Sequence, residues 1–419
     1  MTAVSGPVAH LPTVSRSQPH DALPSARSLQ PEPRTVRVLA LSQSFAPGFR
    51  GGSIQALTYM VARLGSSCEF WVISRDRDPR QPTRLPGVAF DKWTTRGLAR
   101  VFYSTRPHRP VLLARLIAEA APDVVFVNSL FAGGSIALQA LRRAGRVQAP
   151  VVVAPEGELA LGALAQKTGK KRAYLRLAQA LGLLSGVTWM ARDAAERSDI
   201  TREFPDAAPV VIVPCLGPSG SRDFAAPLPK IPGTVTLLYL SRITPKKNLA
   251  FLIQALGDDT VGELDLDIVG PVDDERYWRR CQEAIAQLPS SVRVRYHGEA
   301  MPDDVPGWLA RAHALVLPSL GENYGYVVAE ALEAGRPALV SNETPWHDLQ
   351  GARAGWTLPL TLDAWRTAIG ELRALPDEAY QAWCLGARAH GLAASPTDAA
   401  AEATLDVLRQ ASCGTPLSR

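Results

Sequence analysis

Apolar residues recur along this chain in two alternating patterns. Short apolar runs, such as residues 151–155, have the length and composition of buried parallel strands. Between such runs the apolar positions fall three and four residues apart, as at Ile54, Leu57, Val61 and Leu64, which is typical of an amphipathic helix. Strands that alternate with helices of this length predict right-handed βαβ units around parallel sheets.

The alternation occurs twice, on either side of a run rich in Pro, Gly and Ser. The strands expected in the first half are 36–41, 70–74, 124–128, 151–155, 187–190 and 210–214. The helices expected there are 54–64, 111–120, 135–144, 171–184 and 193–204. The strands expected in the second half are 236–240, 266–269, 292–296, 314–318 and 337–341. The helices expected there are 248–256, 274–288, 327–334, 362–375, 377–390 and 397–410.

The predicted fold is α/β, with two Rossmann-like domains whose parallel sheets face a central cleft. The expected domains are residues 35–216 and 234–395, joined by a linker at 217–233. A disordered tail rich in Pro, Ser and Arg is expected at 1–34, and a helix with a short tail at 396–419. Open α/β sheets bind ligands beyond the carboxyl ends of their strands, so we expect the site in the cleft.

Composition excludes several classes of protein. The chain has 419 residues, 46% of them apolar and 20% charged, and a formal net charge of +5. No apolar run approaches the ~20 residues of a membrane-spanning helix, which excludes an integral membrane protein. Five scattered cysteines without a C-x-x-C pair argue against a disulfide framework and a zinc site. With no apolar signal segment near its start, the chain is expected to be cytoplasmic, and its mild charge favours no nucleic acid partner.

The most specific segment runs from a strand end at Pro318 through a loop carrying Glu322 to a helix that begins near Gly325. The glycine allows a ligand to approach the backbone, and the first-turn N–H groups with the helix dipole suit a phosphate. Glu330 follows about one turn further into the helix. The alternative is a solvent-facing helix with ordinary surface carboxylates. That alternative accounts least well for Glu322, which lies in the loop before the helix.

Two further loops follow predicted strands. The loop after strand 236–240 holds three cations, of which Arg242 and Lys247 are placed to converge on a diphosphate. A solvated basic loop is the alternative. Gly51 and Gly52 follow the first strand and permit close approach of a phosphate or sugar. They form no G-x-G-x-x-G pattern, so a dinucleotide site is poorly supported and a plain turn is the alternative.

Together these segments resemble the retaining, nucleotide-sugar-dependent glycosyltransferases of GT-B fold in glycosyltransferase family four. Glu322 and Glu330 match the family's E-x7-E arrangement, and Arg242 and Lys247 match its R-x4-K arrangement. The glycine pair at 51–52 matches the family's N-terminal glycines. Order and spacing agree from about residue 36 to residue 410.

The resemblance implies roles for these residues. Arg242 and Lys247 would bind the donor diphosphate and stabilise the leaving nucleotide, Glu322 would contact the donor sugar, and Glu330 would contact the ribose. The loop at His297 would lie against the base. The other implied donor-binding residues are Gly51, Gly52, Asn323, Tyr324, Gly325 and Tyr326. Catalysis would rest on charge stabilisation of the departing diphosphate, without a cofactor.

The chain departs from the family after strand 151–155, where many relatives have a histidine. Glu156 occupies that place and Glu158 follows, so both are candidate acceptor-side residues. Two D-x-D patterns, Asp265–Asp267 and Asp76–Asp78, resemble the metal-binding motif of GT-A enzymes. Basic side chains already supply the charge that a metal would supply, so no metal is expected.

The resemblance implies transfer of a sugar from a UDP- or GDP-linked donor to a glycan or a polyprenyl-diphosphate-linked acceptor, in surface or exopolysaccharide assembly. The alternatives are another GT-B enzyme, such as a sugar-nucleotide epimerase or a phosphorylase, and a catalytically silent nucleotide-sugar-binding protein. A basic amphipathic helix suggests peripheral contact with an anionic membrane, against the alternative of a core-packed helix with a solvated cationic face. Its basic residues are Lys167, Lys170, Lys171, Arg172 and Arg176.

Overall fold

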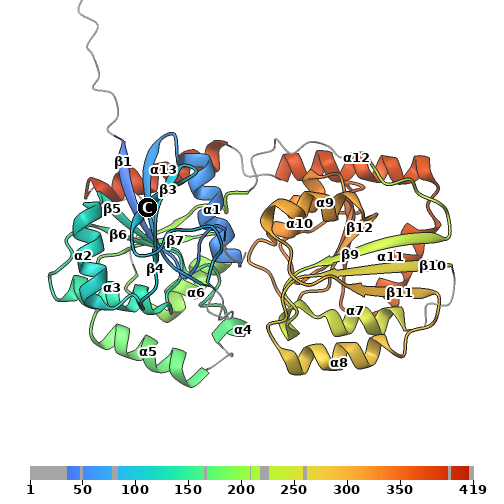
Figure 1. Ribbon diagram of the computed structural model, residues 1–419, viewed down its shortest axis with the longest axis horizontal. Coiled ribbons are helices and arrows are strands. Elements are labelled where there is room, and N and C mark those ends of the chain that lie inside the picture. The colour runs from blue at the N-terminus through green and yellow to red at the C-terminus, as the bar shows by residue number, and fades with distance from the viewer. Residues whose placement is uncertain are drawn as a thin grey trace, which may run out of the picture. The chain divides into compact units, whose positions relative to one another are not determined.

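The computed structural model describes residues 35–47, 51–77, 84–164, 168–207, 209–217, 226–257, 262–394 and 398–414. Within them the chain forms two α/β halves, each with its own sheet (Figure 1). The predicted tail at 1–34 lies outside the described residues. No helix in the described part of the chain is both long enough and apolar enough to cross a membrane.

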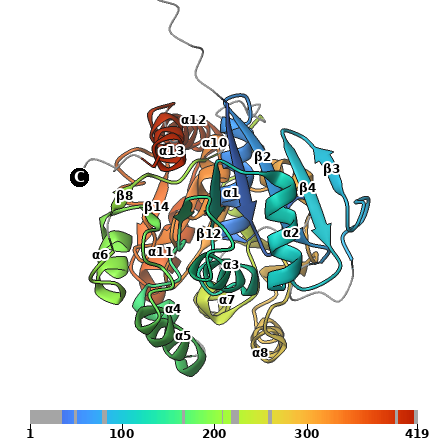
Figure 2. The same ribbon diagram turned by 90° about the vertical axis from the view of Figure 1, so that its left-hand side faces the viewer.

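The sheet of the first half has the strand order β3-β4-β2-β1-β5-β6-β7-β8. Its strands are β1 (Val36–Leu41), β2 (Cys68–Arg75), β3 (Trp93–Arg96), β4 (Ala99–Ser104), β5 (Val124–Val127), β6 (Val151–Val153), β7 (Thr188–Ala191) and β8 (Val210–Ile212). All neighbouring strands are parallel except the pair β3 and β4, which lies at one edge of the sheet (Figure 2). The order reverses between β1 and β5, and ligands of doubly wound folds bind at this kind of switch point.

The sheet of the second half has the order β11-β10-β9-β12-β13-β14, with its switch point between β9 and β12. Its strands are β9 (Thr234–Leu240), β10 (Glu263–Val269), β11 (Val292–Tyr296), β12 (Ala314–Leu317), β13 (Ala338–Ser341) and β14 (Gly355–Leu358). All of these pairs are parallel. Counted from β9, this is the 3-2-1-4-5-6 arrangement of a Rossmann sheet.

Helices complete both halves. Those of the first half are α1 (Gly52–Leu64), α2 (Pro110–Ala120), α3 (Gly133–Arg143), α4 (Leu161–Leu164), α5 (Thr168–Ala180) and α6 (Ala194–Glu203). Those of the second half are α7 (Leu249–Leu256), α8 (Glu275–Ile285), α9 (Val305–Ala310), α10 (Tyr326–Glu333), α11 (Leu362–Ala374) and α12 (Asp377–Ala394), with 3₁₀ turns η1 (Pro245–Lys247) and η2 (Pro302–Asp304). The last helix is α13 (Asp398–Ser412).

Each central strand is apolar on both faces because each sheet lies between two layers of helices. In β1, Leu39 and Leu41 belong to one core cluster, whereas Val38 and Ala40 belong to the cluster on the opposite face. Successive side chains of a strand point to opposite faces, so a strand between two helical layers must be apolar throughout.

The C-terminal helix α13 belongs to the core of the first half although it follows the whole second half in sequence. Leu405 and Leu408 are buried in the same cluster as Val36 and Met60 of the first half. Figure 1 shows α13 against the first sheet, whereas α12 lies over the second. The sequence predicts this helix but not where it packs.

The predicted strands and longer helices are all present, with ends shifted by a few residues. The sequence analysis missed β3, β4, β14 and the short helices α4 and α9. β3 is a half-exposed edge strand of sequence WTTR, so it lacks the apolar run that identifies a buried strand. The predicted linker falls between β8 and β9, and its residues 218–225 lie outside the described part.

Candidate active site

A cavity of about 380 Å³ opens beyond the carboxyl ends of strands from both sheets. Its wall includes Asn128, which follows β5 at the switch point of the first sheet, and Arg242, which follows β9 at the switch point of the second. The wall also contains all but one of the predicted site residues: Gly51, Gly52, Glu156, Glu158, Arg242, Lys247, Glu322, Asn323, Tyr324, Gly325, Tyr326 and Glu330. The two parallel sheets thus bring residues as distant in sequence as Gly51 and Glu330 to one cavity.

The basic loop after β9 is held in shape by carboxylates and a capped turn. Arg242 Nη1 lies 2.6 Å from Asp273 Oδ2, which fixes the guanidinium at the cavity wall. The Thr244 side chain caps η1 by accepting from the backbone N–H of Lys247. Lys246 also lines the cavity, and burial lowers its pKa. The sequence analysis counted Lys246 among the loop cations but did not assign it to the site.

Glu322 forms a buried ion pair with Lys247, whose Nζ lies 2.5 Å from Glu322 Oε1. Burial alone would raise the pKa of Glu322, but Lys247, Lys246 and the Ser319 hydroxyl outweigh it and hold the pKa below its usual value. Glu322 is therefore ionised at neutral pH. The sequence predicts both residues in the site but not their pairing.

The start of α10 is shaped by Gly325, which has φ +79° and sits at the helix N-cap. A Cβ at this position would lie 3.2 Å from the indole Nε1 of Trp346, which donates to Tyr324 O. The first-turn N–H groups of an α-helix have no partner within the helix, and here they begin at a residue of the cavity wall. Among the described residues, the buried Asn323 Nδ2 and Tyr326 hydroxyl have no hydrogen-bond partner.

Glu330 is buried and accepts hydrogen bonds from helix α1 of the other half. The Tyr59 hydroxyl lies 2.7 Å and the Gln55 Nε2 3.2 Å from Glu330 Oε1. The sequence analysis missed both donors because they are about 270 residues away in sequence. The available signal was their spacing, since Gln55 and Tyr59 lie four residues apart and so on one face of α1.

Glu156 adopts a left-handed backbone conformation, with φ +53°, directly after β6. Arg192 Nε lies 3.0 Å and Nη2 2.5 Å from Glu156 Oε1, and both side chains are about 95% buried. Glu196 accepts from the backbone N–H groups of Arg192 and Gly157, at 2.7 and 2.6 Å. Burial and the neighbouring Glu156 raise the pKa of Glu196 to about 7. The sequence analysis missed Arg192 and Glu196.

Glu158 serves chiefly to hold the loop after β5. Its carboxylate accepts from the Ser129 hydroxyl at 2.8 Å and from the backbone N–H groups of Leu130 and Phe131, at 2.5 and 3.4 Å. Burial raises its pKa. Of the two acceptor-side candidates, Glu156 is therefore tied to a guanidinium and Glu158 to backbone donors.

His297 is the one predicted site residue that does not line the cavity. Its Nε2 lies 2.8 Å from Asp267 Oδ1, and its ring lies 4.5 Å from the Trp308 ring. Glu299, two residues later in the same loop, lines the cavity instead. The ring of His297 turns back to the strand carboxylate and away from the cavity wall, and contact of this loop with the base stays a prediction.

The D-x-D pairs are engaged by cations. Asp265 lies 2.8 Å from both Arg293 and Arg295, which extends a ladder of ion pairs across β10 and β11. Asp76 is surrounded by arginines, and Asp78 lies outside the described residues. No group of three or more His, Cys, Asp or Glu in the described ranges has the arrangement of a metal site.

Two family descriptions match most of the chain. "Glycosyl transferase 4-like domain" matches residues 51–215, and "Glycosyl transferases group 1" matches residues 222–350. The chain belongs to the GT-B glycosyltransferases of the family-four type. The two matched ranges correspond to the first half and to the larger part of the second half of this GT-B chain.

The chain is also similar to individual glycosyltransferases and to solved structures of similar fold. The chain is 29% identical over 161 residues to an O-antigen chain mannosyltransferase B of Escherichia coli, covering 37% of this chain and 40% of the relative. The chain thus spans less than half the length of that curated relative. The fold is similar to that of sucrose-phosphate synthase from Thermosynechococcus elongatus, with a TM-score of 0.68, 16% identity, and 91% and 100% of the two chains covered. It is also similar to Anabaena Alr3699/HepE in complex with UDP-glucose, with a TM-score of 0.64, 17% identity, and 89% and 99% covered.

The basic helix predicted to touch a membrane is α5. Its Leu175 and Ala178 are buried, whereas Leu177 and, directly after the helix, Leu181 are 53% and 50% exposed. Lys167 lies outside the described residues. Contact with a membrane stays a prediction.

Proposed function

We propose that this protein transfers a sugar from a nucleotide-sugar donor to a hydroxyl of a glycan or of a lipid-linked acceptor. The observation that carries the proposal is one cavity in which three cations of the β9 loop meet two carboxylates and the start of α10. The cations are Arg242, Lys246 and Lys247, and the carboxylates are Glu322 and Glu330. A sugar nucleotide needs both kinds of group, cations for its diphosphate and carboxylate acceptors for its hydroxyls.

The diphosphate of the donor lies between the β9 loop and the start of α10. Arg242 presents a planar fork held by Asp273, and Lys246 supplies a second charge from a partly dehydrated position. The N-terminal turn of α10 adds backbone donors and its dipole. When the bond between the sugar and the diphosphate breaks, negative charge grows on the departing phosphate, and these preorganised groups stabilise it.

The product keeps the anomeric configuration of the donor, as the resemblance to retaining enzymes implies, and the cations of the β9 loop take the place of a metal. Neighbours of similar fold were solved with UDP and UDP-glucose, which supports a nucleotide-sugar donor. The mannosyltransferase relatives carry names from O-antigen synthesis, which supports a glycan acceptor in surface polysaccharide assembly. Each of these points is a proposal for this chain.

Calorimetric titration with UDP, GDP and ADP tests the donor site. One nucleotide should bind in the micromolar range, and Lys246→Ala should weaken it about tenfold, as expected for loss of one charge-assisted hydrogen bond. Lys92→Ala is the matched control, since Lys92 is exposed and is not part of the cavity wall. Failure of all three nucleotides to bind would contradict the proposal.

Turnover is tested with nucleotide-sugars that carry the base of the nucleotide that binds in the titration. Nucleotide release that requires an added acceptor identifies a transferase, whereas release without an acceptor, or none at all, favours the alternatives. The coupling constant of the new anomeric proton gives the stereochemistry. Activity should persist in EDTA, and its loss would show that a metal is required.

A further inference from the structure

Helix α1 of the first half places one amide side chain beside the carboxylate of Glu330. Gln55 lines the cavity and is only 4% exposed. Its Nε2 lies 3.2 Å from Glu330 Oε1. α1 also packs on the start of α10 through the rings of Tyr59 and Tyr326, whose centroids lie 5.5 Å apart. The place of Gln55 beside Glu330 is therefore fixed by the contact of two helices from different halves.

The orientation of the Gln55 amide follows from this contact. A carboxylate accepts hydrogen bonds, so the donor end of the amide, Nε2, must face Glu330. The acceptor end, Oε1, then lies on the other side of the amide. This oxygen is buried and has no hydrogen-bond partner among the described residues. A buried acceptor without a donor costs free energy, and a ligand that brings a hydroxyl would remove that cost.

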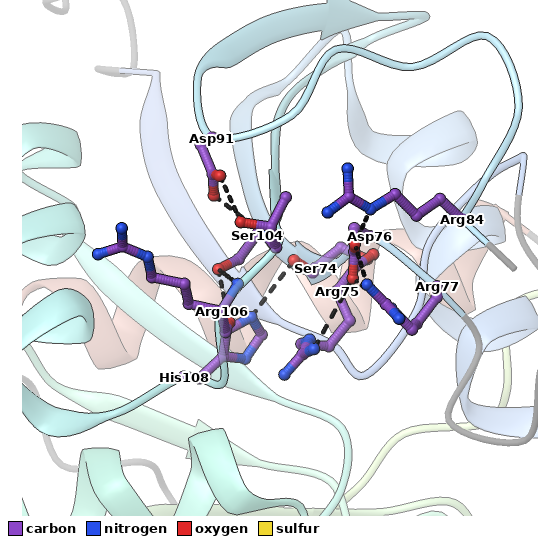
Figure 3. Close-up of polar contacts among 10 residues, drawn as sticks. Ser74, Arg75, Asp76, Arg77, Arg84, Asp91, Ser104, Arg106 and His108 are labelled. Carbon is purple, nitrogen blue, oxygen red and sulfur yellow. Dashed lines mark hydrogen bonds and ion pairs between the residues drawn. The ribbon is translucent and has the colours of Figure 1, made fainter. Parts of the chain in front are cut away.

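Buried carboxylates of the first half differ from Gln55, because they find their partners inside the protein. Asp76, directly after β2, is engaged by three arginine side chains (Figure 3), Arg75, Arg77 and Arg84. Glu158 accepts from a hydroxyl and from two backbone N–H groups. The acceptor of Gln55 has no such internal donor in the described part of the chain, and its residue belongs to the cavity wall. This combination points to a group of the bound ligand.

The neighbouring carboxylate indicates which group that is. In the proposed donor site Glu330 contacts the ribose, which carries two adjacent hydroxyls, each able to donate one hydrogen bond. The two ends of an amide are separated by less than the length of a hydrogen bond. The acceptor of Gln55 therefore lies within reach of a diol that Glu330 holds by its other hydroxyl.

We propose that Gln55 accepts a hydrogen bond from one hydroxyl of the donor ribose through Oε1, while its Nε2 holds Glu330. The inference rests on the proposed glycosyl transfer. It adds that the first half takes part in binding the nucleotide, so that the ribose is held from both halves. A nucleotide that lacks this hydroxyl leaves the acceptor unpaired and binds more weakly, which makes Gln55 a specificity-determining residue.

The test is calorimetric titration of the full chain with the preferred ribonucleotide and with its 2′-deoxy and 3′-deoxy forms. Each deoxy form should bind the unaltered protein about tenfold more weakly than the ribonucleotide does. In Gln55→Met one of these two losses should fall below about threefold, because methionine fills a similar space but has no such acceptor. Tyr59→Phe is the matched comparison. Tyr59 donates to the same oxygen of Glu330 over a shorter distance, 2.7 Å, but is not part of the cavity wall, so this variant should keep that loss near tenfold.

The outcomes separate this inference from the proposed function. If Gln55→Met leaves both losses unchanged, the amide does not contact the ribose, while the donor site stands. If Gln55→Met and Tyr59→Phe reduce the same loss equally, Gln55 acts only by positioning Glu330, which overturns the contact. If no ribonucleotide binds the unaltered protein, the donor site is wrong and the contact falls with it. A deoxynucleotide that binds Gln55→Met as well as it binds the unaltered protein shows that the variant is folded.

Discussion

Replacing Lys247 by methionine should lower the free energy of unfolding, so a loss of activity in this variant would not by itself report on catalysis. Lys247 and Glu322 are only 14% and 10% exposed and lie 2.5 Å apart, so each neutralises a charge that is largely removed from water. Two unit charges about 4 Å apart interact by about 4 kcal/mol at an effective dielectric constant of about 20. Removing one partner of a buried pair costs about 3–5 kcal/mol, because the other charge stays buried.

A double-mutant cycle measures this pairing. Lys247→Met and Glu322→Gln should each lower the free energy of unfolding by about 3 kcal/mol, and the double variant should be at least about 2 kcal/mol more stable than the sum of the two losses predicts. Urea unfolding of the four proteins without nucleotide gives the coupling energy. The exposed pair Arg115–Glu119 is the control and should couple by less than about 0.5 kcal/mol.

A coupling energy near zero for Lys247 and Glu322 would refute the buried pair and the site geometry built on it. If the coupling is found, the double variant becomes the useful tool for function. It loses less stability than the two single losses added together, yet it lacks both charges. Loss of nucleotide binding in the double variant then reports on the site and not on misfolding.

Three further predictions concern binding, pH and backbone geometry. Glu330→Gln should weaken binding of the preferred ribonucleotide about tenfold but leave its 2′,3′-dideoxy form unaffected, and equal losses for both would exclude contact with the ribose. Burial lowers the pKa of His313 from 6.5 to about 4, so only the unfolded chain takes up this proton between those pH values. Stability should therefore fall as the pH drops through that window, by up to about 3 kcal/mol, and His313→Gln should remove this part of the slope in urea unfolding. Gly270→Ala should cost more than about 2 kcal/mol by the same measurement, since φ is +145° and a Cβ would lie 2.0 Å from Ser241 O, whereas Gly307→Ala, with no neighbour within 4 Å, should cost little.

The fold was largely predictable because strands buried on both faces must be apolar runs. The strands at Val36–Leu41 and Ala314–Leu317 are examples, and both lie at the centre of their sheets. The edge strand Trp93–Arg96 has no such requirement and left no pattern to read. Helix Asp398–Ser412 packs on the core of the first half. The sequence does not predict this, because the amphipathic pattern of the helix would suit the core of either half.

The site residues divide in the same way. The place of Arg242 and Glu322 in the cavity wall could be predicted, because both lie in loops after strands and the position of such a loop follows from the fold. Their ion pairs, Arg242 with Asp273 and Glu322 with Lys247, could not be predicted, because side-chain geometry decides them. Glu156 is the clearest case, since only the structure reveals that Arg192 neutralises it.

These partners change what each predicted residue can do. Arg242 is held by Asp273 and Lys247 by Glu322, so two of the three donor-loop cations already share their charge with a carboxylate. Lys246 has no ion pair in the part of the chain that the structure describes, and burial lowers its pKa. A diphosphate entering the cavity would therefore gain most from Lys246, because its charge is neither shared nor well hydrated. Lys246→Ala should then weaken nucleotide binding more than Arg242→Ala does, and titration of both variants with the same nucleotide decides the order. A larger loss for Arg242→Ala would mean that the nucleotide displaces Asp273, and that the fork of the arginine outweighs the free charge of the lysine.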